Sequence, residues 1–238
     1  MTTIQEKHPL KPIAYIYNDF PEKFGIPRQS GIIASLKSTI IFEPEFRNPD
    51  ALRGLEEFSH IWLIWQFSQS VRAHWSPTVR PPRLGGNERK GVFATRSPFR
   101  PNPLGLSCVT LDSIAYTSQH GPILHIGGAD LMNQTPIYDI KPYIPYSDCH
   151  PEASGSFSEQ HKQDRLDVYI PEECLAKISS DHLLSLYEIL ALDPRPAYQN
   201  DSSRIYGFFY ANMEIKFYVK EHTATVCAVE TIENISKQ

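Results

Sequence analysis

The sequence predicts a mainly β protein, with a larger N-terminal β domain and a smaller α+β domain after it. Proline supplies 20 of the 238 residues, which leaves few uninterrupted runs for long helices. Short apolar segments rich in Ile, Val, Tyr and Phe recur along residues 10–145, with almost no helical pattern between them. This spacing argues against alternating βαβ units and favours an antiparallel or mixed barrel or sandwich.

The elements of the first domain follow from these apolar segments. Residues 58–69 are apolar on both faces, as in a central buried strand, and residues 30–42 are strand-like with a break at Lys37–Ser38. A short helix is expected from Pro49, with Asn48 as its cap. The expected strands cover residues 10–18, 30–42, 58–69, 91–95, 104–116, 122–130 and 137–145.

A polar stretch separates this domain from the tail. Residues 147–164 carry almost no large apolar side chains, so we expect a linker there, between a β domain over 10–146 and an α+β domain over 165–238. In the tail, a helix opens at Pro171 and an amphipathic helix covers 181–192, capped by Asp181. Residues 204–231 alternate around two turns and predict a three-stranded meander.

Composition excludes several classes of protein. The formal charge is −4, which rules out a globally basic nucleic-acid coat. No apolar run reaches the ~18 residues that cross a membrane, and residues 1–10 contain no signal-peptide core. The four cysteines include no CxxC pair, so we expect reduced thiols, a cytoplasmic location and no metal site. No GxG, P-loop, HExxH or GxSxG motif occurs.

One segment is strongly basic. Residues 72–102 contain seven Lys or Arg and a single acid, Glu88, which gives this segment +6 and the rest of the chain −10. With Trp75, Phe93 and Phe99 interleaved, this predicts a face that binds RNA; a solvated loop with scattered ion pairs is the alternative. The candidate RNA-binding residues are Arg72, Arg80, Arg83, Arg89, Lys90 and Arg100, with Arg195 added from the tail.

Four other places carry polar groups on rigid backbone. Three prolines stiffen residues 94–107, where Arg96, Arg100 and Asn102 suit ligand clamps, unless the stretch is a plain connector. Residues 25–31 form a Gly/Pro-bounded turn with Arg28 and Gln29. His60 lies in an apolar strand, where a lone His is usually a buried, hydrogen-bonded core residue. Polar residues 130–141 suit a strand end lining a cleft, or a turn with Asx capping.

Five segments together resemble one family. They are IPRQSG, GLEEFSHIWLIWQF, VRPPRLGG, GVFATRSPFRPNPLGLS and ADLMNQTPIYDIKPYIP, and they are similar to the TsaA-like/TrmO family of tRNA methyltransferases. ALDPRPAY in the tail resembles the C-terminal domain of its two-domain bacterial members. The resemblance implies a small β-barrel that binds S-adenosylmethionine, a homodimer with the cofactor near the subunit interface, and methylation of N6 of N6-threonylcarbamoyladenosine beside the tRNA anticodon.

The resemblance also implies roles for particular residues. The family usually has DLxDxTP where this chain has Asn133, so a role that needs a charge there is in question. Because the target nitrogen is poorly nucleophilic, a base would help, and both Asp130 and Asp139 are candidates. The implied cofactor-binding residues are Pro27, Arg28, Gln29, His60, Ile61, Arg96, Leu106, Asp130, Leu131, Met132 and Asn133.

Two other functions stay open at this point. A non-catalytic RNA-binding barrel would use the basic segment and its aromatic residues, and would not bind S-adenosylmethionine. A small-molecule hydrolase would use His60 and Asp130 as acid and base without a cofactor. In the tail, the turn at 193–198 could carry Arg195 across an interface into a partner's cleft, or simply end the helix.

Overall fold

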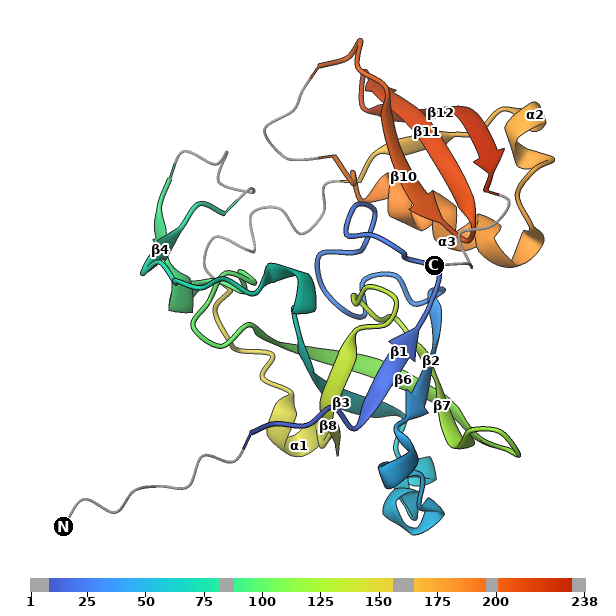
Figure 1. The fold of residues 1–238 in the computed structure, drawn as a ribbon. Helices are drawn as coiled ribbons and strands as arrows, with labels where there is room; N and C mark the ends of the chain where they lie inside the picture. The colour runs from blue at the N-terminus through green and yellow to red at the C-terminus, as the bar shows by residue number, and fades with distance from the viewer. Residues whose placement is uncertain (1–8, 82–87, 156–164, 196–200, 233–238) are drawn as a thin grey trace.

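The computed structural model describes residues 9–81, 88–155, 165–195 and 201–232 (Figure 1). It has two parts. The first is a closed barrel of six strands, in the order β1-β2-β7-β6-β3-β8, and the second is a smaller sheet with helices beside it. All neighbouring barrel strands are antiparallel. The predicted mainly β class is confirmed, and of the two expected architectures the chain adopts the barrel.

The barrel strands alternate between an apolar interior and an outer face. They are β1 (Ala14–Tyr17), β2 (Lys37–Phe42), β3 (His60–Gln66), β6 (Leu104–Thr117), β7 (Gly121–Gly127) and β8 (Pro136–Pro142). In β3, Ile61, Leu63 and Trp65 are buried, while Trp62 and Ile64 are half-buried on the other face. The expectation of a strand buried on both faces is therefore wrong, because a barrel has one interior and this outer face stays partly open.

Short 3₁₀ helices connect the strands. They cover Pro44–Phe46, Pro49–Leu52, Leu55–Glu57, Ser68–Ser70 and Val92–Ala94. Asn48 caps the second of them as predicted, its side chain accepting from the backbone nitrogen of Asp50 at 3.0 Å. The helix expected from Pro49 is however two separate turns, because Gly54 between them has a φ of +87°.

Two predicted strands are shorter than expected. Residues 30–36 are turns, and β2 begins at Lys37, where the sequence has its break. In the segment 91–95, Gly91 ends the two-residue strand β5 (Lys90–Gly91), which pairs with β4 (Thr78–Val79). The 3₁₀ helix then follows directly. Both segments lie outside the barrel sheet, where alternation alone cannot specify pairing.

The C-terminal sheet contains the predicted meander. Its strands are β10 (Tyr206–Tyr210), β11 (Met213–Lys220) and β12 (Thr223–Thr231). A fourth strand, β9 (Asp167–Tyr169), pairs parallel with β12 and was not predicted.

The described α-helices are α1 (Pro145–Asp148), which follows β8, and α2 (Glu172–Leu175) and α3 (Ser180–Ala191) in the C-terminal part. Ser179 is the N-cap of α3, so the prediction of Asp181 as the cap is wrong by two residues.

The segment between β1 and β2 belongs to the core of the C-terminal part. Phe20, Ile33 and Leu36 are buried in one apolar cluster with residues of α3 and of β10–β12, among them Leu186 and Phe208. In Figure 1 this segment, in blue, lies directly below the C-terminal sheet. The apolar side chains of residues 30–36 are therefore explained by burial against the other domain rather than by a strand. Shared burial of this kind fixes the orientation of the two parts.

Candidate cofactor site and RNA interface

The turn at residues 27–30 meets the arginine–proline motif at one end of the barrel. Pro27 is buried, and Gln29 is half-buried. The Nε2 atom of Gln29 donates to the carbonyl of Arg28 at 2.5 Å, and its Oε1 atom accepts from Nη1 of Arg96. Two segments 67 residues apart in the chain are thereby joined by one amide.

Asp130 completes this cluster. Its Oδ1 atom accepts from Oγ of Ser107 at 2.5 Å, and the carboxylate also interacts with Arg96 and with the backbone of Ser30. Burial raises the pKa of Asp130 above its usual value, and the hydrogen bond from Ser107 and the charge of Arg96 oppose that rise. We call Gln29, Arg96 and Asp130 the Gln–Arg–Asp cluster.

Ser107 and Trp65 support the cluster from the barrel interior, and the sequence analysis missed both. Ser107 is 1% exposed and Trp65 is 5% exposed. The indole Nε1 of Trp65 donates to Oγ of Ser107 at 2.9 Å, so one hydrogen-bond chain runs from the core to the carboxylate of Asp130. The sequence contained one signal for Ser107, since it is a serine at the end of the motif 94–107. In the structure Ser107 pairs with Leu63 of the apolar strand β3.

Asn133 has a structural role. Its Oδ1 atom accepts from the backbone nitrogen of Asn18 at 3.1 Å, and its own backbone nitrogen donates to the carbonyl of Phe20 at 2.8 Å. Asn18 in turn donates to the carbonyl of Leu131, a fully buried residue. These bonds hold the loop that follows β7 against the start of the interdomain segment. They use the side chain of Asn133 as a hydrogen-bond acceptor and its backbone as a donor, and neither bond needs a charge at this position.

Several predicted site residues lie away from the cluster. His60 is exposed, not buried as the apolar strand suggested, and hydrogen-bonds Ser59 at 2.9 Å. Ile61 is fully buried in the barrel, whereas Leu106 is 57% exposed on the outer face. Asp139 is paired with Lys141 at 2.9 Å. Leu63 pairs with Ser107, and His60 lies three residues from Leu63 along β3. This separation along the strand is roughly 10 Å.

The basic residues 72–102 fall into two groups: some contact the arginine–proline motif, and others are exposed to solvent. The guanidinium of Arg72 lies 3.5 Å from the ring centre of Phe99, and Arg100 donates to the carbonyl of Thr95 at 3.1 Å, so both hold the arginine–proline motif in shape. Arg80 and Arg89 are exposed. Lys90 pairs with Glu88 at 2.5 Å. Arg83 lies outside the described residues.

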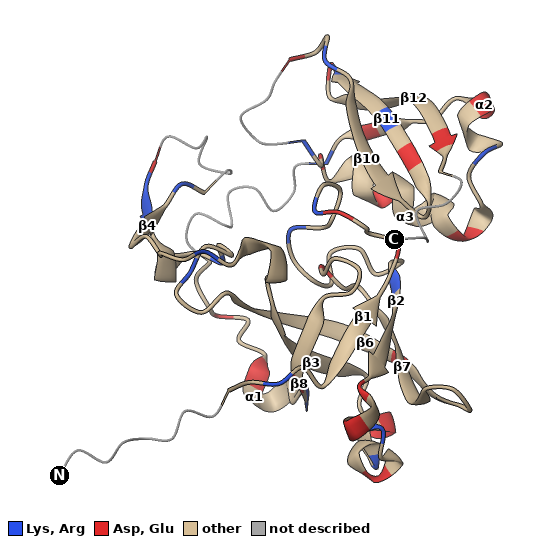
Figure 2. Cartoon of the chain, in the orientation of Figure 1, with Lys and Arg blue, Asp and Glu red and all other residues tan. Residues whose placement is uncertain are grey.

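Exposed aromatic side chains accompany these arginines. Trp75 and Phe93 are 53% and 72% exposed, and their ring centres are 6.3 Å apart. We call the short hairpin of β4 and β5, with the residues beside it, the module around β4. In Figure 2 this module carries basic residues and lies beside the barrel, on a side where the C-terminal domain also has basic residues. Exposed aromatic rings next to arginines are the combination on which unpaired bases stack.

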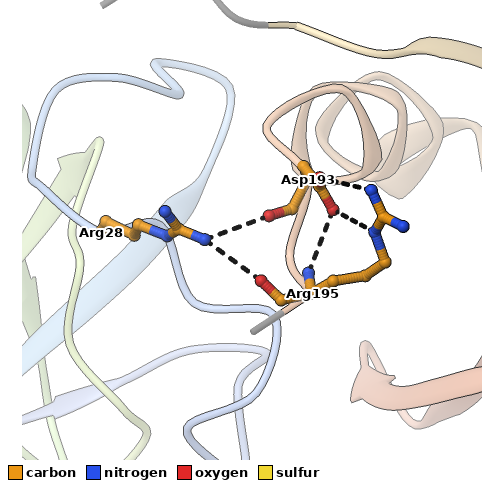
Figure 3. Close-up of polar contacts among 3 residues, drawn as sticks. All are labelled: Arg28, Asp193 and Arg195. Atoms are coloured by element: carbon orange, nitrogen blue, oxygen red, sulfur yellow. Dashed lines mark hydrogen bonds and ion pairs between the residues drawn. The ribbon is translucent and has the colours of Figure 1, made fainter. Parts of the chain in front are cut away.

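The turn after α3 lies against the turn at residues 27–30 of the same chain. Asp193 and Arg195 form an ion pair at 2.8 Å, and Arg195 has only 10% of its side chain exposed. Nη2 of Arg28 donates to the carbonyls of Asp193 and Arg195 (Figure 3). Arg195 thus lies beside the turn at residues 27–30 of its own chain.

Metal-binding and membrane-spanning features are both missing from the described part of the chain. Within the described ranges, no group of three or more His, Cys, Asp or Glu side chains is arranged to hold a metal ion. No helix in that part of the chain is long and apolar enough to span a membrane.

The chain matches two family models, the tRNA-methyltransferase O N-terminal domain over residues 15–149 and the TrmO C-terminal domain over residues 163–232. It belongs to the TrmO family of tRNA methyltransferases.

Individual relatives agree with this assignment. The tRNA (adenine(37)-N6)-methyltransferase of Escherichia coli K12 is 38% identical over 226 residues, covering 92% of this chain and 96% of the relative. The protein of the same name from Eikenella corrodens is 42% identical, covering 74% and 99%. A crystal structure of TrmO from Pseudomonas aeruginosa superimposes with a TM-score of 0.76 at 29% identity, covering 94% and 99% of the two chains.

Proposed function

We propose that this protein transfers a methyl group from S-adenosylmethionine to N6 of N6-threonylcarbamoyladenosine beside the anticodon of tRNA, in the cytoplasm. The observation that carries the proposal is the Gln–Arg–Asp cluster at the end of a barrel, in a chain that matches the TrmO family over residues 15–149 and 163–232. Relatives are tRNA (adenine(37)-N6)-methyltransferases. A Pseudomonas aeruginosa relative, 36% identical over 221 residues, carries a name that includes S-adenosylmethionine dependence.

The residues of the cluster suit this cofactor. Arg96 offers a cation for a carboxylate, Asp130 offers a carboxylate for a positive charge, and the amide of Gln29 can donate to or accept from an adenine edge. When bound, S-adenosylmethionine supplies a methyl group on a positively charged sulfur. Arg96 would bind the carboxylate of S-adenosylmethionine, and Gln29 would orient its adenine. The protein's main task is then to align nucleophile, methyl and sulfur, which is a matter of positioning.

Asp130 is the better candidate for the base. As the new N–C bond forms and the S–C bond breaks, the target nitrogen must lose its proton, and a nearby carboxylate can accept it. The raised pKa of Asp130 brings it closer to the range where a carboxylate works as a base near neutral pH. Asp139 instead pairs with Lys141 on β8 and has no contact with the cluster among the interactions of the described residues.

The RNA would approach over the module around β4. Arg80 and Arg89 would bind phosphates, while Trp75 and Phe93 would stack on bases of the anticodon loop. Because bases in such a loop are already partly unstacked, the enzyme does not need to open a duplex. Arg72 and Arg100 contribute indirectly, by bracing the loop that carries Arg96.

We also propose a two-fold dimer through the outer face of β3 and β6. Leu106 is 57% exposed there and pairs across the strands with half-buried Ile64, next to Trp62. An exposed apolar patch on a barrel is typical of an interaction surface. Leu106→Glu should therefore convert the dimer into a monomer in sedimentation velocity, whereas Leu10→Glu, at another exposed leucine, should leave it dimeric.

The two alternative functions make different predictions. The hydrolase requires His60 to work with Asp130, yet His60 lies further along β3 and bonds Ser59. The RNA-binding barrel predicts no methylation.

The test is incubation of purified protein with S-adenosylmethionine and tRNA that carries threonylcarbamoyladenosine, followed by mass spectrometry of the nucleosides. One methyl group should appear on that nucleoside with the wild type and with Asp139→Asn. Asp130→Asn should reduce the rate by about 10²–10⁴-fold. Bound but unmethylated tRNA would favour the RNA-binding barrel instead.

A further inference from the structure

The turn that ends α3 is organised by a single carboxylate. Asp193 has a left-handed φ of +51°. Its Oδ1 atom accepts from the backbone nitrogen of Arg195 at 3.3 Å and from Nε at 2.8 Å, and its Oδ2 atom accepts from Nη2 at 2.8 Å. The guanidinium of Arg195 is therefore engaged inside its own turn. A two-point pairing of this kind gives the turn a defined shape.

That shape presents two backbone carbonyls to the barrel. Nη2 of Arg28 donates to the carbonyl of Asp193 at 3.4 Å and to that of Arg195 at 3.2 Å (Figure 3). Both carbonyls belong to the turn after the C-cap Leu192, so Arg28 binds the turn and not the helix itself. The side chain of Arg28 is thus held by the C-terminal domain, although Arg28 belongs to the turn at residues 27–30, which contacts the barrel.

The remaining groups of the same turn are held by the barrel. The carbonyl of Arg28 accepts from the side chain of Gln29 at 2.5 Å. Gln29 accepts from Arg96, and the backbone of Ser30 hydrogen-bonds the carboxylate of Asp130. Because Gln29 and Ser30 follow Arg28 directly in the chain, a shift of the backbone at Arg28 would also move Gln29 relative to Arg96 and Ser30 relative to Asp130.

We propose that the turn at Asp193–Arg195 positions the cofactor site by holding Arg28, so that the C-terminal domain contributes to binding of the methyl donor without touching it. This inference rests on the proposed function, because it concerns the same site. Asp193 is then a positioning residue that acts through Arg28. The shared apolar cluster around Phe20 and Phe208 keeps the two domains close enough for this contact.

The experiment measures the dissociation constant for S-adenosylmethionine by calorimetry on the full chain. Asp193→Ala should weaken binding about tenfold, since bonds to a charged group are worth roughly this much or more. The KM for the cofactor should rise by a similar factor, with kcat at saturating cofactor within about twofold of wild type. Asp193→Asn keeps an acceptor and tolerates the left-handed φ, so it should recover most of the affinity.

Asp201→Ala is the matched control. Asp201 builds a similar turn in the same domain, accepting from the backbone nitrogen of Ser203 at 2.9 Å, and its removal should leave the affinity unchanged. Arg28→Lys should weaken binding as Asp193→Ala does. The double variant should be no weaker than the weaker single variant, because both changes break one path.

The possible outcomes separate the two proposals. Unchanged affinity in Asp193→Ala overturns the positioning role, as does an equal loss in Asp201→Ala or full additivity with Arg28→Lys. If the wild type itself binds no S-adenosylmethionine, the proposed function is overturned, and this inference with it.

Discussion

Gly105 lies where the arginine–proline motif passes the indole of Trp65. The two residues are cross-strand partners in β6 and β3. A Cβ atom on residue 105 would come within 2.7 Å of the indole Cδ2 and nearer still to Cε2 and Cζ2. The ring has little freedom to yield, because it is 5% exposed, packs on Phe67 at 4.2 Å between ring centres and bonds Ser107. Gly105→Ala should therefore displace Trp65.

The expected loss of stability follows from these interactions. Overpacking a core of this kind costs about 1–3 kcal/mol, and breaking the hydrogen bond between Trp65 and Ser107 adds about 1 kcal/mol. The free energy of unfolding should fall by roughly 2–4 kcal/mol, which moves the urea midpoint by about 1 M for a chain of this size. Because Ser107 also holds Asp130, affinity for S-adenosylmethionine should fall as well.

The assay is urea unfolding followed by circular dichroism, with calorimetry of the cofactor. Gly91→Ala is the control, since a Cβ at that position meets nothing within 4 Å and its φ of −58° suits alanine. It should unfold at the wild-type midpoint or slightly above it. If Gly105→Ala matched the Gly91→Ala midpoint, the indole would be free to move and the steric argument would be refuted.

Three further predictions follow from the structure. Burial raises the pKa of Asp130 in the folded state. The wild type should therefore lose stability relative to Asp130→Asn as the pH rises from about 4 through that raised pKa. Thermal melts of the two proteins that showed the opposite trend would contradict this prediction. Arg80→Ala with Arg89→Ala should lower the slope of log K for tRNA against log salt by about one unit for each phosphate that these side chains bind, and an unaltered slope would mean that these arginines do not bind phosphate. Gly25→Ala should destabilise the chain by more than about 1 kcal/mol, because Gly25 has a φ of +94° and a Cβ there would lie 2.7 Å from Phe208; a wild-type melting temperature would argue against a rigid domain contact.

Much of the fold could be predicted because the signals were local. Strands β1, β3, β6, β7 and β8 follow from short apolar segments of β-forming residues, and the C-terminal meander follows from period-two alternation; both are properties of each segment alone. The predictions for residues 30–36 and 91–95 were wrong, since apolar residues there pack on another domain or form a short turn. A periodic pattern reports that a face is buried and does not say what covers it.

The site was predictable in part. Gln29, Arg96 and Asp130 were expected from motifs, and the structure brings them together. Ser107 and Trp65 were missed, because a serine inside an apolar strand becomes informative only once its register against β3 is known. His60 was expected in the core and is exposed, since a strand sequence alone does not say which of its two faces lies inside a barrel.

The sequence by itself determined the class of fold, the positions of most strands along the chain, the basic segment and the motifs of the family, because each depends on residue type and short-range spacing. Tertiary structure decided that the barrel closes, that residues 20–36 enter the core of the C-terminal domain, and that Arg28 meets the turn at Asp193. The hydrogen bond between Arg28 and Arg195 alone joins residues 167 positions apart. These interactions arise from how two apolar surfaces bury each other, and pairing of that kind is a property of the folded chain rather than of any local segment.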